Sequence, residues 1–308
     1  MQDHIKNHYK STGSYTYAGP YADYFRSLPD DLYELAHLVC AQIIHRATLR
    51  DGNTNANKDL IYGDMTRFPW YRQRCEDDVF LTASAMTAEL FRLDESGFTA
   101  NRAVENKIVL TCRYVSVLMS AIFKAKSIPC RSRNGFAPYF FENQSVDHWI
   151  NQVWSEKESR WITFDADGLY DQNQIKFYQY DMPVNCFDWA ADTWLAVRRG
   201  QPDRTKYIYS EGPGENSLRA IIRCIFYDFH ALMNHEISYN FQPCYIDGKF
   251  DQLTEDDLSE IDELSELLTD PDKNFDELLI IWNTKRKFRI LNSPLVGNRD
   301  NLPHLLIP

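Results

Sequence analysis

The chain has 308 residues and a formal net charge of −11, which argues against a groove for nucleic-acid phosphates. The first residues contain no apolar run of the signal-peptide kind, and no stretch reaches the ~18 apolar residues of a membrane-spanning helix. Seven widely spaced cysteines without a Cys-x-x-Cys pair are typical of reduced thiols. Composition therefore predicts a cytoplasmic protein with no nucleic-acid or membrane partner.

The N-terminal part, residues 16–105, is predicted to be mainly helical, and the polar residues before it are predicted to be loose. Ser27 is a suitable cap for a first helix, whose apolar positions continue through Leu35 to Ile44. A polar stretch at 50–59 has no apolar period and is predicted to be a loop. A second helix is predicted from Asp77 to Leu93.

The central part, residues 106–200, contains a predicted amphipathic helix that begins at Cys112. Thr111 is an acceptable N-cap, and Pro129 marks the far boundary. The apolar positions at helical spacing are Val115, Leu118, Met119 and Ile122, and the wetter stripe consists of Arg113, Ser116, Ser120 and Lys124. Cys112 then falls in the first turn, where the helix dipole and the neighbouring Arg113 favour the nucleophilic thiolate.

Two runs of β-branched and aromatic residues, His148–Trp154 and Arg160–Asp165, predict an antiparallel hairpin. A turn centred between Glu156 and Lys157 would pair residues whose numbers sum to 313, which sets His148 opposite Asp165. Side chains paired in this way have Cβ atoms about 5 Å apart, so the carboxylate can hold the imidazole in one tautomer. The turn has no Gly or Asn to fix the register of the hairpin. Asp167, two residues after Asp165, is the alternative acid partner of His148.

These segments follow one another as Cys112-Arg113-Tyr114 with an Ile128-Pro129-Cys130-Arg131 exit, then Asp147-His148-Trp149, then Trp161-Ile162-Thr163-Phe164-Asp165. The order and motifs resemble the transglutaminase-like superfamily of papain-like cysteine enzymes, over roughly residues 106–170. The chain differs from the common pattern at Thr111 and Tyr114. Gly19 to Phe25 and Gly135 to Phe140 are similar to a bacterial branch of such proteins, which favours a bacterial transglutaminase-domain protein.

The resemblance implies an α+β fold with a papain-like core, in which the nucleophile helix packs on an antiparallel sheet. It also implies acyl transfer through a thioester: Cys112 would attack an amide or thioester donor, His148 would move the proton, and Asp165 would orient His148. The donor would be a peptide, a protein or a small molecule, and the preferred acceptor is an amine. Transfer to water, as in a peptidase or amidase, is the first alternative. A catalytically silent binding protein of the same fold is the second.

An oxyanion hole is only partly visible in the sequence. The backbone N–H of Cys112 at the helix start is one donor, and the side-chain amide of Asn106 is a second candidate, although Asn106 also suits an ordinary loop. The chain has no calcium loop and no His-Glu-x-x-His motif, so no metal and no cofactor are expected.

Three further residues are candidates for substrate binding. Arg131 and Arg133 alternate along the strand after Pro129, share a face, and would clamp a carboxylate through paired hydrogen bonds. The alternative is a solvated strand face with ion pairs. Trp149 follows the candidate histidine directly.

The C-terminal part, residues 201–308, is predicted to be mainly helical and to belong with the rest to one domain, 1–308. Helices are predicted from Phe187 to Arg199 and from Leu218 to Glu236, with a break at Gly200 to Asp203. The acidic segment around Glu255 is predicted to be an amphipathic helix, with leucines on one face and charges in water. The final residues, Leu295 to Pro308, are expected to be extended.

Overall fold

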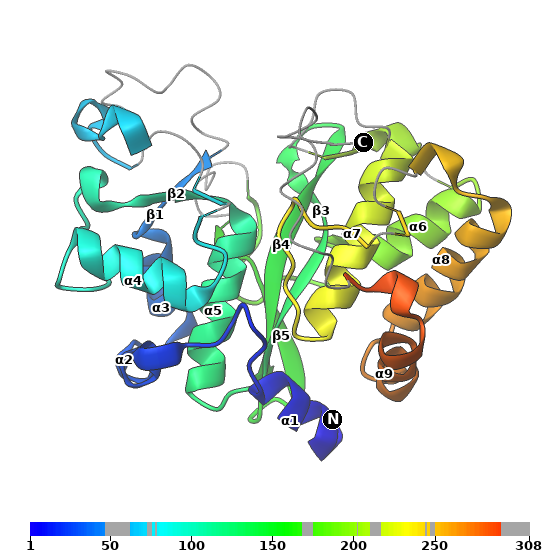
Figure 1. Ribbon diagram of the computed structural model, residues 1–308, viewed down its shortest axis with the longest axis horizontal. Coiled ribbons are helices and arrows are strands. Elements are labelled where there is room, and N and C mark those ends of the chain that lie inside the picture. Colours follow the sequence, from blue (N-terminus) through cyan, green and yellow to red (C-terminus); the bar gives the residue numbers. More distant parts are fainter. Residues whose placement is uncertain are drawn as a thin grey trace, which may run out of the picture.

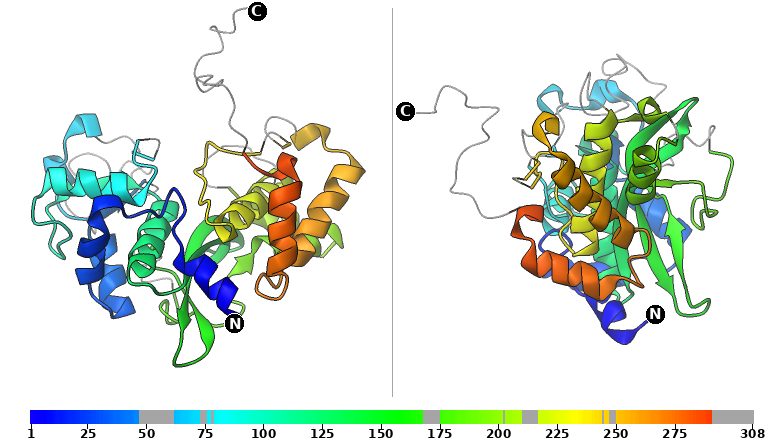
Figure 2. Two further views of the ribbon diagram at one scale, coloured as in Figure 1. Left: turned by 60° about the horizontal axis from the view of Figure 1, so that its bottom comes forward. Right: turned by 90° about the vertical axis from the view of Figure 1, so that its right-hand side faces the viewer.

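The protein combines helices and β-strands in an α+β arrangement, as the sequence predicts (Figure 1). The computed structural model describes residues 1–46, 62–72, 76–77, 79–167, 175–201, 203–209, 217–243, 245–246 and 250–290. The sheet lies between helices α2 to α5 on one side of the molecule and α6 to α9 on the other (Figures 1 and 2). Within the described part of the chain, none of the helices has the length and apolar character that a transmembrane segment needs.

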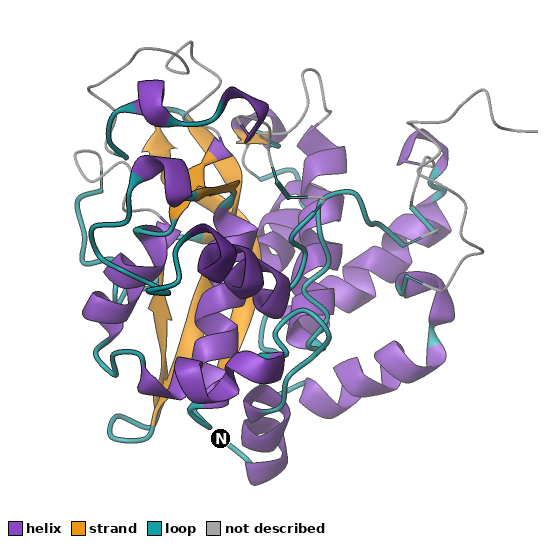
Figure 3. Ribbon diagram, turned by 60° about the vertical axis from the view of Figure 1, so that its left-hand side comes forward, coloured by secondary structure: helices purple, strands orange, loops and turns teal. Residues whose placement is uncertain are grey.

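The described elements follow in chain order. The α-helices are α1 (Asp3–Lys10), α2 (Ala22–Ser27), α3 (Leu32–Cys40), α4 (Ala83–Leu93), α5 (Cys112–Ala125), α6 (Ala190–Arg198), α7 (Ser217–Leu232), α8 (Glu255–Leu268) and α9 (Phe275–Thr284). The strands are β1 (Ile43–His45), β2 (Ile108–Leu110), β3 (Cys130–Phe141), β4 (Gln144–Ser155), β5 (Arg160–Phe164), β6 (Asp188–Trp189) and β7 (Tyr207–Ile208). Strands β5, β4, β3 and β6 are neighbours in that order, β7 also pairs with β4, and β1 and β2 form a separate parallel pair. Figure 3 shows the strands in orange among the purple helices.

Helix α5 begins at Cys112, as predicted, and is buried along nearly its whole length. Its apolar face joins a core cluster with helices α2 to α4. The stripe expected to be wet is also buried, which corrects the sequence analysis. Ser116 donates a hydrogen bond to Ser132 of β3 (2.8 Å), and the amide of Asn151 of β4 donates to Ser120 (2.9 Å). Because buried polar groups need partners, these bonds fix α5 against the sheet.

The N-terminal part departs from prediction at both ends of its first long helix. The cap of α3 is Asp31 and not Ser27, since the Asp31 carboxylate accepts a hydrogen bond from the backbone N–H of Glu34. The helix stops at Cys40, and Ile43–His45 forms strand β1, which pairs with Ile108–Leu110. Two adjacent β-branched residues favour this strand, and the pairing buries them.

Two further boundaries differ from expectation. The segment before residue 16, expected to be loose, contains α1. Its Ile5 and Tyr9 are buried in the C-terminal core, the hydrophobic cluster formed mainly by α6 to α9. The next helix, α4, begins at Ala83 and not at Asp77, because Thr82 caps it by accepting a hydrogen bond from Ala85 N–H. The predicted loop at 50–59 and the predicted extended tail lie outside the described residues.

The hairpin of β4 and β5 is present with a different register. Ser155 lies opposite Arg160 and Asn151 opposite Phe164, so paired numbers sum to 315 and not 313. The turn contains four residues, and Ser159 adopts a φ of +54°. A shift of two positions keeps every side chain on its expected face. His148 and Asp165 therefore stay on one face, but diagonally.

The C-terminal helices match the predicted segments with shorter bounds. Asp188 and Trp189 form β6 before α6 starts, and α7 ends at Leu232. The acidic helix α8 has a capping box between Thr254 and Asp257, and it buries Leu264 and Leu268. Helices α6 to α9 and α1 form one hydrophobic cluster, which packs against the sheet through α7.

Gly135 leaves room for the edge strand β6 beside His148. It pairs with His148 on one side and with Trp189 on the other. A Cβ at this position would lie 2.4 Å from the Asp188 carbonyl oxygen and 2.6 Å from the Phe187 ring. We expect Gly135→Ala to displace β6 and to lower the free energy of unfolding by about 1–3 kcal/mol. Urea denaturation measures this, and an unchanged midpoint would contradict the close packing.

Candidate active site

Cys112 occupies the first position of α5, where the helix dipole favours an anion. The side chain of its N-cap, Thr111, makes no capping bond. The Thr111 hydroxyl instead lies 3.4 Å from an Asp77 carboxylate oxygen and 3.3 Å from the Tyr239 hydroxyl. The Cys112 side chain is only 5% exposed. The predicted position of the thiol in the first turn is therefore confirmed.

The predicted contact between His148 and Asp165 is present. His148 Nε2 lies 2.9 Å from Asp165 Oδ2, and both side chains are buried. The Tyr139 hydroxyl donates to the same carboxylate oxygen at 2.7 Å. The Phe140 ring meets the imidazole edge-on, with centroids 4.9 Å apart. The histidine is therefore held by a carboxylate and an aromatic ring together, despite the shifted register.

Cys112 and His148 interact through their charges and a side-chain hydrogen bond. Burial acts to raise the pKa of the Cys112 thiol, but the charge and hydrogen bond of His148, with a hydrogen bond from His45, bring it below its ordinary value. Burial likewise opposes charge on His148, while Asp165 and Cys112 raise the pKa of this imidazole well above its usual range. Both directions favour the pair of a thiolate and an imidazolium over the neutral pair.

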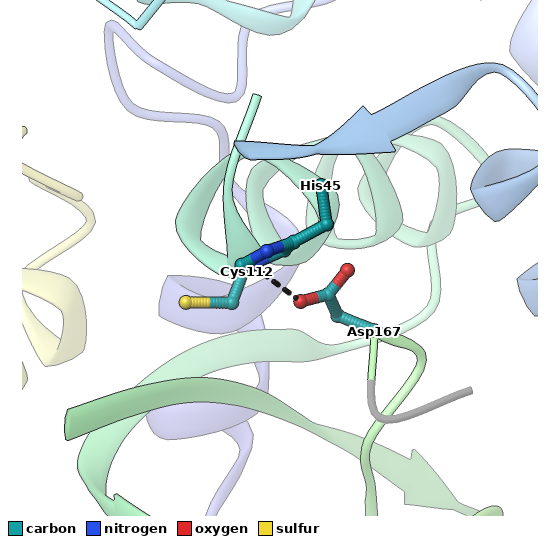
Figure 4. A group of neighbouring side chains, drawn as sticks. All are labelled: His45, Cys112 and Asp167. Atoms are coloured by element: carbon teal, nitrogen blue, oxygen red, sulfur yellow. Dashed lines mark ion pairs between the residues drawn. The ribbon is translucent and has the colours of Figure 1, made fainter. Parts of the chain in front are cut away.

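A second histidine, His45, also contacts the thiol, and the sequence analysis missed it. His45 Nε2 lies 3.2 Å from Asp167 Oδ2, and the same imidazole hydrogen-bonds Cys112. Figure 4 shows the three side chains together, from the end of β1, the start of α5 and the segment after β5. Burial opposes charge on His45, but Asp167 and Cys112 raise its pKa to about 10. Asp167, the alternative acid for His148, thus pairs with a different histidine.

These three groups also form a donor set that suits a divalent metal ion. One ligand atom each from His45, Cys112 and Asp167 lies within 4.8 Å of the others. Imidazole, thiolate and carboxylate are ligands that zinc accepts. No spacing motif in the sequence predicts this donor set, because the three residues are 67 and 55 positions apart.

Tyr239 is another neighbour of the thiol that the sequence did not reveal. Its hydroxyl lies 3.3 Å from Cys112 Sγ and comes from the segment after α7. Burial first, and then the Cys112 charge, raise the pKa of Tyr239 well above its usual value. The phenol therefore stays protonated and can donate to sulfur.

Asn106 does not fit the predicted role of oxyanion donor. It ends a 3-10 turn, Val104–Asn106, and its carbonyl accepts a hydrogen bond from Arg102. The backbone then runs extended through β2 to Thr111. Six extended residues span about 20 Å, which is too far for an amide side chain to reach a carbonyl bound at Cys112.

Arg131 and Arg133 share a face, as predicted, since both donate to Gln152 Oε1. They are buried and not solvated, and their donors serve the protein itself. Arg131 pairs with Asp272 (2.5 Å), and Arg133 forms a bidentate pair with Asp228 (2.8 and 2.9 Å). These partners correct the expected substrate clamp to a link between β3 and the C-terminal helices.

Trp149 is also buried and does not present a binding surface. Its ring lies 5.8 Å from the ring of Tyr227 on α7, within the C-terminal core. The side chain is 1% exposed. Trp149 therefore packs β4 against α7, and a direct substrate contact does not fit this placement.

Comparisons with known proteins add no relative to this description. No family model matches the chain, and no curated protein or solved structure matches it either.

Proposed function

We propose that this protein is a cysteine acyltransferase with a papain-like, transglutaminase-like active site. The observation that supports the proposal most directly is the contact of Cys112 with His148, which Asp165 holds at 2.9 Å. A nucleophile, a base and an orienting group in mutual contact form the geometric signature of covalent acyl transfer. Cys112, His148 and Asp165 are then the catalytic triad.

The reaction proceeds in two halves. The Cys112 thiolate attacks the carbonyl carbon of an amide or thioester, an S–C bond forms, and the leaving group departs with the proton of the His148 imidazolium. The neutral His148 then removes a proton from the acceptor, whose attack breaks the S–C bond and restores the thiolate. Asp165 keeps the imidazole oriented and stabilises its cationic form.

The acceptor decides whether the enzyme transfers or hydrolyses. The site is nearly closed, because Cys112 and His148 are 5% and 2% exposed. A closed site limits the access of bulk water to the thioester, which favours transfer once an acceptor amine is bound. We therefore favour transfer to an amine over hydrolysis. Mass analysis of the products from a test amide, with and without an added amine, distinguishes the two outcomes.

The first test of the proposal is brief iodoacetamide labelling at about pH 6, with mass spectrometry to locate the modified cysteine. Burial raises the pKa of Cys40, Cys130, Cys186 and Cys224, while that of Cys112 is lowered. Because the thiolate is the reactive form, we expect Cys112 to react at least about 10-fold faster than the other described thiols.

Cys186 is the informative comparison in this experiment. It is more exposed than Cys112, so simple accessibility would favour Cys186. Preferential labelling of Cys112 would show that the ion pair, and not exposure, controls reactivity. Labelling that follows exposure would refute the activated nucleophile and favour a binding protein of the same fold.

A further inference from the structure

The thiol of Cys112 has two imidazole neighbours, and the proposed triad uses only one of them. His148 with Asp165 already supplies the base and its orienting carboxylate. His45 with Asp167 repeats the arrangement from different elements, with a 3.2 Å ion pair. A buried histidine and a buried aspartate beside a nucleophile are costly to maintain without a role. The second pair therefore needs its own explanation.

The contacts of His45 place a hydrogen-bond donor beside the thiol. His45 Nε2 lies 3.2 Å from Asp167 Oδ2, and one donor atom each of His45, Cys112 and Asp167 lies within 4.8 Å of the others. The carboxylate therefore orients the imidazole next to the sulfur. An imidazole N–H donates to an oxygen acceptor, and so His45 can serve a group that forms beside Cys112.

The proposed reaction needs a second donor for the oxyanion, and the side chains that contact the sulfur, His45 and Tyr239, are the candidates. The backbone N–H of Cys112 lies at the helix start, and Asn106 is too far along the extended chain. The oxyanion forms on the atom next to the carbon that sulfur attacks. A donor that contacts sulfur in the resting enzyme is therefore placed close to this oxygen.

We propose that His45, held by Asp167, donates a hydrogen bond to the oxyanion that forms when Cys112 attacks a carbonyl carbon. In this step the S–C bond forms, the carbonyl π pair moves to oxygen, and His45 keeps its proton. Collapse restores the C=O bond and expels the leaving group. His45 is then a catalytic residue and Asp167 a positioning residue. The inference rests on the proposed function, because it assigns a donor to the same reaction.

Two electrophiles separate this role from simple activation of the thiol. Acylation by 4-nitrophenyl acetate passes through an oxyanion, whereas alkylation by iodoacetamide at its methylene carbon does not. Both rate constants are measured for Cys112 at the pH where each variant reaches its plateau, so that the thiolate fraction is equal. A Cys112→Ala protein supplies the background for the release of 4-nitrophenolate.

We expect His45→Gln to lower the acylation rate constant by about 100-fold, as loss of one oxyanion donor does. Its alkylation rate constant should stay within about 3-fold, which also shows that the variant is folded around the thiol. Tyr239→Phe is the matched comparison, because it removes another hydroxyl donor at 3.3 Å from sulfur. Its acylation should fall less than that of His45→Gln, because Asp167 orients His45 beside the sulfur while the Tyr239 hydroxyl is shared with Thr111.

Asp167→Asn tests the positioning role with the same two electrophiles. Without the carboxylate, His45 loses the ion pair at 3.2 Å that orients it, so the acylation rate constant should fall, though less than in His45→Gln. The alkylation rate constant should stay within about 3-fold, because alkylation forms no oxyanion. A merely structural role for Asp167 would lower both rate constants together.

Three results would overturn the inference. Equal losses of acylation and alkylation in His45→Gln would mean that His45 only activates the thiol, and unchanged acylation would mean that it has no catalytic role. If EDTA accelerates both reactions of the unaltered protein but not of His45→Gln, the three donors hold a metal ion. Failure of the proposed function is distinguishable, because then iodoacetamide would not select Cys112 even in the unaltered protein.

Discussion

Replacing His148 with alanine is expected to slow the alkylation of Cys112 at about pH 6 by roughly 10- to 100-fold. Burial alone raises the pKa of this thiol, and the His148 charge is the largest of the effects that lower it. Without the imidazolium, few thiolates remain at this pH. The greater nucleophilicity of a more basic thiolate offsets part of the loss. The second-order rate constant with iodoacetamide measures the effect.

The pH dependence of the alkylation rate gives the direction of the expected effect. In the unaltered protein the lowered pKa of Cys112 means that the rate reaches its plateau at a lower pH than it would for an ordinary thiol. In His148→Ala the rate should rise only as pH approaches and passes the ordinary thiol range, and the two curves should converge above it. Coinciding curves would contradict the ion pair.

Two variants complete this experiment. Asp165→Asn should reduce the rate less than His148→Ala, because the imidazole remains beside the thiol and loses only its orienting carboxylate. His4→Ala is the control, since His4 lies on α1 and pairs with Asp276 in an exposed position. A rate loss in His4→Ala equal to that in His148→Ala would mean that the assay reports unfolding.

The parts of the site that the sequence predicted are those set by local patterns. The apolar spacing after Cys112 locates α5, and the aromatic and β-branched runs locate β4 and β5. The predicted register between β4 and β5 is wrong by two positions, because the turn sequence does not determine the number of residues in the turn. The contact of His148 with Asp165 survived because an even shift preserves the face.

The second histidine was missed for a specific reason. The pair Ile43-Ile44 fits the apolar period of the preceding helix, so the local pattern predicts a helix that continues to Ile44. The structure ends it at Cys40 and places His45 at the end of a strand beside β2. Strand pairing depends on residues 65 positions away, which a local window cannot detect. A two-residue β-branched run just before a histidine is the signal that a strand was present.

The burial of Arg133 likewise cannot be predicted from the local sequence. Two arginines that alternate on a strand usually face solvent or a ligand, and the sequence gives no sign of their partners. The carboxylate that pairs with Arg133 is Asp228, 95 residues later on α7. A pairing at this separation is determined by tertiary packing, and so the choice between a substrate clamp and a structural ion pair requires the fold.

Removing the Asp228 carboxylate is expected to lower the free energy of unfolding by about 3–5 kcal/mol, because it leaves a buried guanidinium unpaired. Asp228 accepts hydrogen bonds from Arg133 Nε and Nη2 at 2.8 and 2.9 Å and from Asn134 N–H at 2.9 Å. The Arg133 guanidinium also lies 4.4 Å from the Trp189 ring. Urea denaturation of Asp228→Ala, with midpoint and slope, measures the loss.

The double variant Arg133→Met, Asp228→Leu distinguishes a structural role of the Arg133–Asp228 ion pair from a role of Arg133 in substrate binding. Replacing both charges with apolar side chains of similar size removes the unpaired charge, so most of the stability lost in Asp228→Ala should return. Activity should return with it, because the arginine's donors face Asp228 and Gln152 and not a ligand. If stability returns but substrate binding does not, Arg133 is a substrate clamp after all. Recovery of both would show that the ion pair holds β3 against α7, and that the site needs the guanidinium only as part of the fold.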